Sequence, residues 1–347
     1  DCTIDVDIGV GDLLITNYTG TITFEQGTMA DVTVATNFYL GSDATIVCTY
    51  ASLAGEGTGR VFTVGNNAVV LGTLDANRQG FPQDQGPGTG SGTSHAASHG
   101  GWAPTGGPVY GSLTEPTSLG SGGSSGNHSG GGAIRLDVGG TLDLEGTITA
   151  NSYGQFSDGS GGSVWITAET FEGDGLISAR SPSDWRCGGG GRVAIYYTNS
   201  TFTGDVNLKG LHSTQEGNRM AHPGTLWEPK RFDTVQGTAG APADVTISLS
   251  FQYHFPDSRT NYWNLTLTNA ARVFFSSATL NVEDLTVRGN GNSLNDYSVL
   301  RTDVDESGNE EQAGQTALTV SDRLVLTNGA QVCFSDAIVE ASEIYVV

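Results

Sequence analysis

The chain has 347 residues and a formal net charge of −22, because 37 Asp and Glu residues stand against only 15 Lys and Arg residues. A surface of this sign repels nucleic-acid phosphates and anionic lipid and attracts divalent cations, and no apolar run approaches the roughly 20 residues that span a bilayer. We therefore expect neither nucleic-acid binding nor membrane insertion.

The first segment, residues 1–77, reads as a series of short β-strands. Apolar and polar residues alternate in each run, and glycine and asparagine separate the runs. Alternation with period two is typical of strands that bury one face, and no stretch shows the 3.6-residue period of an amphipathic helix. We interpret residues 1–77 as N-terminal β-rich coils.

The four cysteines show no CxxC spacing, which argues against a zinc or redox site. An even number of cysteines in a chain interpreted as extracellular favours disulfides, and a bond between Cys2 and Cys48 would tie down the first coil. Pairing of Cys187 with Cys333 stays open, because Cys333 lies in an apolar run and reads equally well as a core residue.

Residues 78–130 form a segment dominated by glycine and serine. By composition it is either a disordered linker or a long excursion from one coil. Strand patterns continue on both sides, so we expect an excursion that packs on the coils, with Trp102, Tyr110 and Leu113 as anchors. His95 and His99 read as loop residues, with a metal site that includes His128 as the alternative.

Residues 131–223 repeat one pattern three times. A Gly-Gly pair followed by alternating aliphatic residues begins at 131, 161 and 190, which gives a period of about 30 residues. Such a period with strand chemistry predicts stacked coils of a parallel β-helix, in which Ile134, Val164 and Val193 line up. The expected fold class is all-β, a right-handed parallel β-helix (β-solenoid) with a long Gly/Ser-rich insertion.

The last third of the chain resumes the repetition after an interruption. Residues 224–263 carry prolines and an aromatic cluster and read as an irregular junction, while 264–347 read as C-terminal β-helix coils. Asn17 and Asn328 each follow a similar strand, and an asparagine there suits a left-handed turn. Because the sequence stops on an apolar strand, we expect it to continue into further chain or a neighbouring subunit.

One acidic loop resembles the first half of a calcium-binding loop. Asp303, Asp305 and Ser307 alternate before Gly308, and hard oxygen ligands at such positions converge on Ca²⁺. The glutamate expected at position 12 of such a loop is missing, and Glu310 or Glu311 is the substitute. A solvated acidic loop without metal is the alternative reading.

Four N-glycosylation sequons favour an extracellular or cell-surface protein. The acceptors are Asn17, Asn127, Asn199 and Asn264. The three-residue pattern is common by chance in a chain rich in serine and threonine, so ordinary turn residues are the alternative. Glycans are accordingly expected partners only where a sequon is used.

The repeated openings at 131–136, 161–166 and 190–195 resemble the parallel β-helix superfamily that includes pectin and pectate lyases, polygalacturonases and many surface adhesins. The resemblance implies the fold more than an activity. The glycine-dense runs at 99–101 and 130–132 look like segments of large secreted repeat proteins of aquatic microbes. This second resemblance implies a structural or adhesive role in walls, sheaths or surface fibres.

Three functions follow from these patterns. The preferred one is an extracellular structural building block of a surface filament, appendage or sheath, acting as a homo-oligomer or as part of a longer repeat chain and not as an enzyme. The first alternative is a polysaccharide lyase or hydrolase, although the Asn-Thr-Asp, Gly-His-Gly and Arg-Ile-Lys elements of polygalacturonases are absent from the sequence. The second is a carbohydrate-binding adhesin, with Trp102, Trp165, Trp185 and Trp227 as stacking platforms whose other reading is core or turn packing.

Overall fold

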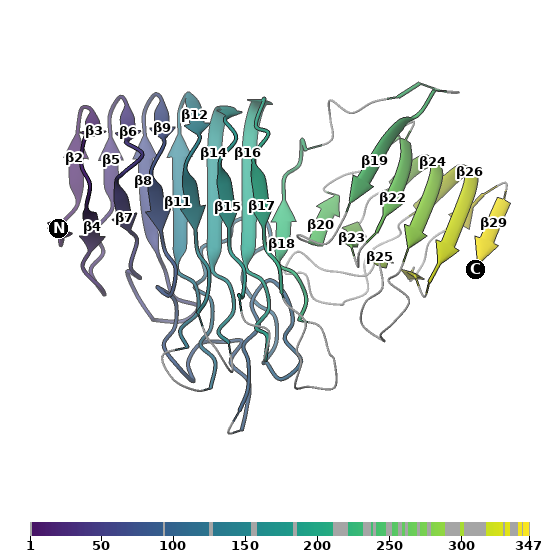
Figure 1. The fold of residues 1–347 in the computed structure, drawn as a ribbon, viewed down its shortest axis with the longest axis horizontal. Coiled ribbons are helices and arrows are strands. Elements are labelled where there is room, and N and C mark those ends of the chain that lie inside the picture. Colours follow the sequence, from purple (N-terminus) through teal and green to yellow (C-terminus); the bar gives the residue numbers. More distant parts are fainter. Residues whose placement is uncertain are drawn as a thin grey trace. The chain divides into compact units, whose positions relative to one another are not determined.

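The structure is a computed structural model in which the chain is all-β and the strands pair in parallel (Figure 1). It describes residues 2–346 except 93, 125–127, 154–157, 183–185, 211–220, 232–236, 239–240, 248–251, 256–258, 261–262, 269–270, 276–278, 289–298, 302–316, 329, 334–338 and 342. The chain divides into two units, Asp1–Gly224 and Thr225–Val347. In the part of the chain that the structure describes, no helix is long and apolar enough to cross a membrane.

In unit 1, the chain winds in successive circuits, and each circuit adds one strand to a sheet that we call sheet A. The inward side chains of sheet A stack in register, with Ile22 beside Ile46 and Leu74 beside Ile148. These aliphatic side chains are nearly all buried, so the alternation seen in the sequence is the alternation between core and surface. The strands of sheet A, in spatial order, are β1 (Cys2–Ile4), β4 (Thr21–Phe24), β7 (Thr45–Val47), β10 (Thr73–Asp75), β13 (Thr147–Thr149), β15 (Leu176–Ser178) and β17 (Asp205–Asn207).

The same circuits build a second parallel sheet of unit 1, sheet B. Ile134 pairs in register with Val164, and Val164 with Val193, which confirms the predicted alignment of the three repeats. One row of sheet B consists of β2 (Ile8–Val10), β5 (Val32–Val34), β8 (Arg60–Val64), β11 (Ala133–Val138), β14 (Ser163–Glu172) and β16 (Arg192–Ser200). A shorter row consists of β3 (Leu13–Ile15), β6 (Phe38–Leu40), β9 (Ala68–Val70) and β12 (Thr141–Leu144), and β12 also pairs with β14.

The repeated glycines are required by close contacts between the backbones of neighbouring circuits. A Cβ atom on Gly131 would lie 1.9 Å from the Ala150 carbonyl oxygen, and one on Gly161 would lie 2.0 Å from the Ala179 carbonyl oxygen. No side chain fits at such distances, so only glycine allows the backbones to approach this closely. The periodic Gly-Gly pairs are therefore a packing requirement of unit 1.

The excursion, residues 78–130, connects β10 to β11 and packs against the circuits of unit 1. Its glycines join those of the circuits through backbone hydrogen bonds, such as Gly120 N–H to Gly131 O at 2.8 Å. Tyr110 and Leu113 are buried, as predicted. Trp102 is not the anchor that we expected, because its side chain remains 37% exposed. Its ring lies 5.4 Å from the ring of His222. The linker alternative is wrong for the described residues of this segment.

Unit 2 also consists of parallel strands, in two rows. Leu265 pairs with Leu285 and Leu285 with Leu324, so the two similar phrases of the sequence do line up, although the steps are 20 residues (285 − 265) and 39 residues (324 − 285). One row consists of β18 (Thr225–Trp227), β20 (Gln252–Phe255), β23 (Arg272–Phe275), β25 (Val299–Arg301) and β27 (Gln331–Cys333). The other consists of β19 (Ala243–Ile247), β21 (Arg259–Thr260), β22 (Trp263–Leu267), β24 (Thr279–Arg288), β26 (Ala317–Thr327), β28 (Val339–Glu340) and β29 (Glu343–Val346).

The predicted disulfide between Cys2 and Cys48 is wrong, because both thiols are free in the structure. Cys2 pairs in register with Ile22, and Ile22 pairs with Ile46, so Cys2 lies two strand spacings, about 9.5 Å, from the strand that precedes Cys48. A disulfide needs Cα atoms within about 7 Å of each other. Cys187 is completely buried, and the side chain of Cys333 lies outside the described residues.

Two of the predicted turn asparagines adopt the expected backbone conformation. Asn17 has a φ of 52° and Asn328 a φ of 55°, both in the left-handed region. Asparagines of neighbouring circuits also stack elsewhere in unit 1, where Asn66 Nδ2 donates to Asn37 Oδ1 at 3.2 Å. Side-chain amides thus extend the backbone ladder across the turns.

Candidate functional site

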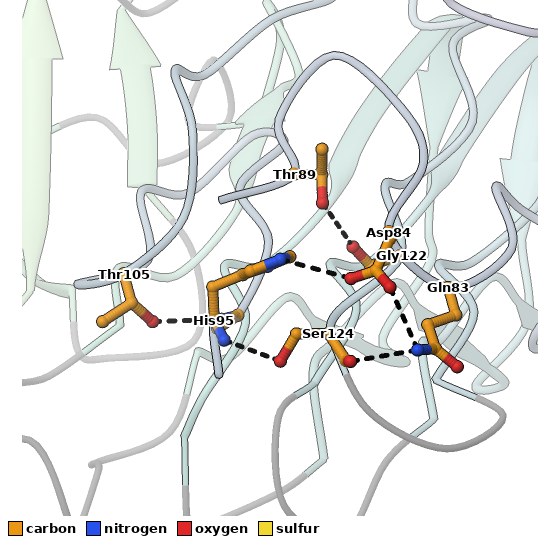
Figure 2. Close-up of polar contacts among 8 residues, drawn as sticks. Gln83, Asp84, Thr89, His95, Thr105, Gly122 and Ser124 are labelled. Atoms are coloured by element: carbon orange, nitrogen blue, oxygen red, sulfur yellow. Dashed lines mark hydrogen bonds and ion pairs between the residues drawn. The ribbon is translucent and has the colours of Figure 1, made fainter. Parts of the chain in front are cut away.

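A network of polar contacts fixes the first half of the excursion (Figure 2). The ring of His95 is almost fully buried, and its Nε2 lies 3.2 Å from Asp84 Oδ1. The backbone N–H of His95 donates to Ser124 Oγ at 2.7 Å, and Gln83 Nε2 donates to the Ser124 carbonyl oxygen at 3.0 Å. These bonds connect residues that are about 30 to 40 positions apart in sequence, so they hold the two ends of the excursion together.

The same network does not have the geometry of a nucleophilic triad. A catalytic serine needs its hydroxyl bonded to a ring nitrogen of the base. Here Ser124 Oγ accepts the backbone N–H of His95 instead. We infer that Asp84, His95 and Ser124 together serve to position the excursion.

A second histidine of the excursion is buried more deeply. His99 is completely inaccessible to solvent, its Nδ1 donates to the Gly161 carbonyl oxygen at 2.8 Å, and its ring lies 4.6 Å from that of Tyr110. Burial, with the nearby Arg192 as the second cause, lowers the pKa of His99 to about 3. His99 is therefore a neutral core residue of unit 1 throughout the physiological pH range.

Residues 110–119, which we call the strap, cross the outer face of sheet B. Tyr196 Oη donates to the Thr114 carbonyl oxygen at 2.8 Å, and Ser163 Oγ donates to the Ser118 carbonyl oxygen at 2.6 Å. Ser118 Oγ in turn donates to Glu56 Oε2 at 2.6 Å. The strap therefore contacts several circuits, and its far end lies beside the start of β8.

A pocket opens between this end of the strap and the starts of β8 and β11, and we call it the strap pocket. Its volume is about 170 Å³, which suits one ring or one aliphatic group. Burial raises the pKa of Asp31, whose Oδ1 accepts the Val61 backbone N–H at 3.0 Å. The residues that line the strap pocket are mostly apolar or neutral: Met29, Asp31, Ala51, Thr58, Gly59, Arg60, Val61, Pro116, Thr117, Ala133, Ile134 and Arg135.

The floor of the strap pocket contains a buried arginine that is already fully bonded. Arg60 is 1% exposed, and its guanidinium donates to backbone carbonyl oxygens that include those of Thr49 at 2.7 Å and Glu25 at 2.6 Å. Further bonds reach Thr28, Ala30 and Tyr50, so no N–H of the guanidinium remains for a ligand. Arg60 is thus part of the core that ties the turn before β5 to β8.

The rim of the strap pocket carries the exposed charge. The Arg135 guanidinium lies 3.9 Å from the centre of the Trp165 ring and 2.7 Å from Asp137 Oδ2. One face of Trp165 is therefore covered by Arg135 and is not open for stacking on a sugar. Trp263, which the sequence did not single out, is completely buried, and Trp185 lies outside the described residues.

The predicted metal and glycosylation residues are only partly described. Asp303, Asp305, Ser307 and Glu310 all lie outside the described residues, as does Asn127. Among the described residues, no group of three or more His, Cys, Asp or Glu side chains could hold a metal ion, so His95, His99 and His128 do not form one. Asn17 and Asn199 are exposed, and Asn264 is half-buried with its amide donating to Asp244 Oδ1 at 3.0 Å.

Sequence reasoning missed the strap pocket because its wall comes from four separate stretches of chain. Asp31, Arg60 and Arg135 belong to different circuits, and Pro116 and Thr117 belong to the strap. No local motif joins them. The one available signal was Arg60, a charged residue that begins a strand with otherwise apolar inward positions, and that signal is weak.

Comparisons of the chain with protein-family models, with curated proteins and with solved structures found no match in any of the three. The fold defines an all-β protein of stacked parallel strands.

Proposed function

We propose that the chain is an extracellular structural protein of the pectin-lyase-like β-helix superfamily, a length of right-handed parallel β-helix in a surface filament, appendage or sheath. The proposal is supported by sheets that grow by one strand per circuit and have an open edge. β29 pairs on one side with β26, and all four of its residues are exposed, with Ile344 at 59% and Val346 at 75%. An edge of this kind accepts a further parallel strand.

The first circuit of unit 1 presents a second edge of the same type. Among the strands that the structure describes, β1, β2 and β3 pair on one side only, with β4, β5 and β6. Leu14 and Val10 are exposed there, although they occupy a strand. Apolar side chains on open edges favour addition of more circuits, supplied by further polypeptide or by a second copy, and such head-to-tail contacts build fibres.

The test is the assembly state of residues 1–347 at increasing concentration. Sedimentation velocity and electron microscopy are expected to show rods that lengthen with concentration. Ile344→Lys places a charge on the edge of β29 and should stop the growth, whereas Thr63→Lys, on an exposed position of a central strand, should leave it unchanged. Monomers at every concentration, or equal effects of the two variants, would contradict edge-to-edge assembly.

A second candidate function is a carbohydrate-binding adhesin, and the strap pocket favours it. The pocket offers an apolar wall with a single carboxylate, Asp31, at a concave site of the surface. Isothermal titration with neutral and uronic-acid oligosaccharides tests this function, with Asp31→Asn as the variant and Asp43→Asn, at an exposed turn position that does not line the pocket, as the control. Depolymerisation of a uronic-acid polymer in the same samples would instead support the lyase or hydrolase alternative.

A further inference from the structure

The outer face of sheet A carries threonine at six of its eight outward positions on β4, β7, β10 and β13. Thr21, Thr45, Thr73 and Thr147 are in register with one another and form one row. The second row holds Thr23, Val47, Asp75 and Thr149. We call these two rows the threonine face.

The positions of the threonine face follow from the alternation of the strands. Ile46, Leu74 and Ile148 point into the core and are buried, and the residues on either side of each point outward and are half-buried. The exception is Thr149, which is 6% exposed and donates its hydroxyl to Asp75 Oδ1 at 3.3 Å, so the open part of the face is the first row. Strands in a sheet are about 4.8 Å apart, and residues i and i+2 of one strand are about 6.7 Å apart. The threonine face is thus a regular grid with these two spacings.

The grid is preorganised. Threonine is branched at Cβ and has few side-chain rotamers, so little conformational entropy is lost when a ligand contacts it. The hydroxyls of Thr45, Thr73 and Thr147 bond to no other side chain or backbone group among the described residues. The strands of unit 1 run side by side (Figure 1).

The chemistry of the threonine face selects against most ligands. The first row has no charge, and the second has only Asp75, although the whole chain carries a net charge of −22. A polyelectrolyte would find no counter-charge there. A polysaccharide is usually held by stacking on aromatic rings, and neither row contains one.

The spacing of the first row instead matches tetrahedral water. A water oxygen about 2.8 Å from each of two hydroxyls that are about 4.8 Å apart makes an O···O···O angle of about 118°, close to the tetrahedral angle. A row of equally spaced hydroxyls can therefore hold a row of equally spaced waters, while the methyl groups orient the waters between rows. A lattice of water gains one such contact at each circuit, whereas a charged surface would impose its own hydration.

We propose that the threonine face of sheet A binds ice. The ligand is the crystalline surface of water itself, and the site is distinct from the strap pocket, which lies at the starts of β8 and β11 in sheet B. This inference does not depend on the proposed structural function. A chain that binds ice without forming filaments would support ice binding and contradict the proposed structural function.

The experiment measures the shape of single ice crystals, thermal hysteresis and enrichment of the protein in slowly grown ice. Unmodified protein is expected to facet the crystals, to depress freezing below melting and to enter the ice. Thr73→Lys should abolish all three effects, because a long charged side chain interrupts the row. Thr33→Lys, on the exposed face of β5 in sheet B, should retain them.

Circular dichroism and the melting temperature establish that both variants are folded. If Thr73→Lys does not fold, Thr73→Gln is the test variant, since it is neutral but too long for the row. Round crystals and exclusion of the unmodified protein from ice would overturn the proposal. Equal loss in the sheet A and sheet B variants would overturn it as well, because the effect would then not belong to the threonine face.

Discussion

Acid should destabilise unit 1 through His99. The ring is completely buried against Tyr110 and the glycine backbone, and its charged form would have no water around it. Its pKa is lowered from 6.5 to about 3, first by burial and then by Arg192. Because the folded pKa lies below the unfolded one, the neutral ring stabilises the fold fully above pH 6.5, and this contribution is lost as the pH falls towards 3.

The size of the effect follows from the shift. Each unit of pKa difference corresponds to about 1.36 kcal/mol, so a shift from 6.5 to about 3 corresponds to a loss that approaches about 5 kcal/mol as the pH falls below 3. Half of that loss should be present near pH 5. A loss of this size is comparable with the whole stability of a typical domain, about 5 to 15 kcal/mol, so protonation of His99 should favour opening of unit 1 in acid.

The assay compares unmodified protein with His99→Asn, which keeps a donor close to the position of Nδ1 but cannot be protonated. Hydrogen exchange of the amides in β11 and β14, followed by mass spectrometry at pH 7, 5 and 4, reports the opening of unit 1 within the full chain. The variant should lose stability at pH 7 but show a flatter dependence on pH. An identical pH dependence of the two proteins would refute the assignment to His99.

Two further predictions concern packing. Gly161→Ala should destabilise unit 1 by more than the usual 0.5 to 3 kcal/mol of a point substitution, because its Cβ would lie 2.0 Å from the Ala179 carbonyl oxygen; Gly9→Ala, which meets no atom within 4 Å, should leave the melting temperature unchanged. Arg60→Met should cost several kcal/mol in chemical unfolding, since each buried carbonyl oxygen that loses its donor costs about 1 to 3 kcal/mol. Arg135→Met, at the rim of the strap pocket, should cost less than about 1 kcal/mol, and equal costs for the two arginines would contradict the buried network.

The repeats were readable from the sequence because their cause is local and periodic. Ile134, Val164 and Val193 each follow a Gly-Gly pair by the same number of residues, and a regular circuit converts equal spacing into vertical alignment. Leu265 and Leu324 also occupy equivalent positions, two strands apart, as their similar flanking sequences indicate. The strand between them, which contributes Leu285, was not predicted, because the two steps have unequal lengths of 20 and 39 residues.

Other features depended on contacts between distant segments. His95 and His99 read as loop residues in a glycine-rich stretch, yet both are buried, because the excursion folds back on the circuits. Trp102 was expected inside and stayed partly exposed. The predicted disulfide between Cys2 and Cys48 was wrong because β4 lies between the strand of Cys2 and the strand that precedes Cys48. The distance between the two cysteines becomes known only when this strand order is known.

By itself, the sequence determined that the secondary structure is β-strand, what the period of the repeats is and where glycine is needed. These features follow from the alternation of apolar residues and from backbone sterics within one circuit. Only the tertiary structure decided which circuits are neighbours, and therefore which side chains from different circuits share a wall or a row. The strap pocket and the threonine face both arise in this way. Their residues become adjacent when the circuits stack at the fixed distance that backbone hydrogen bonds impose.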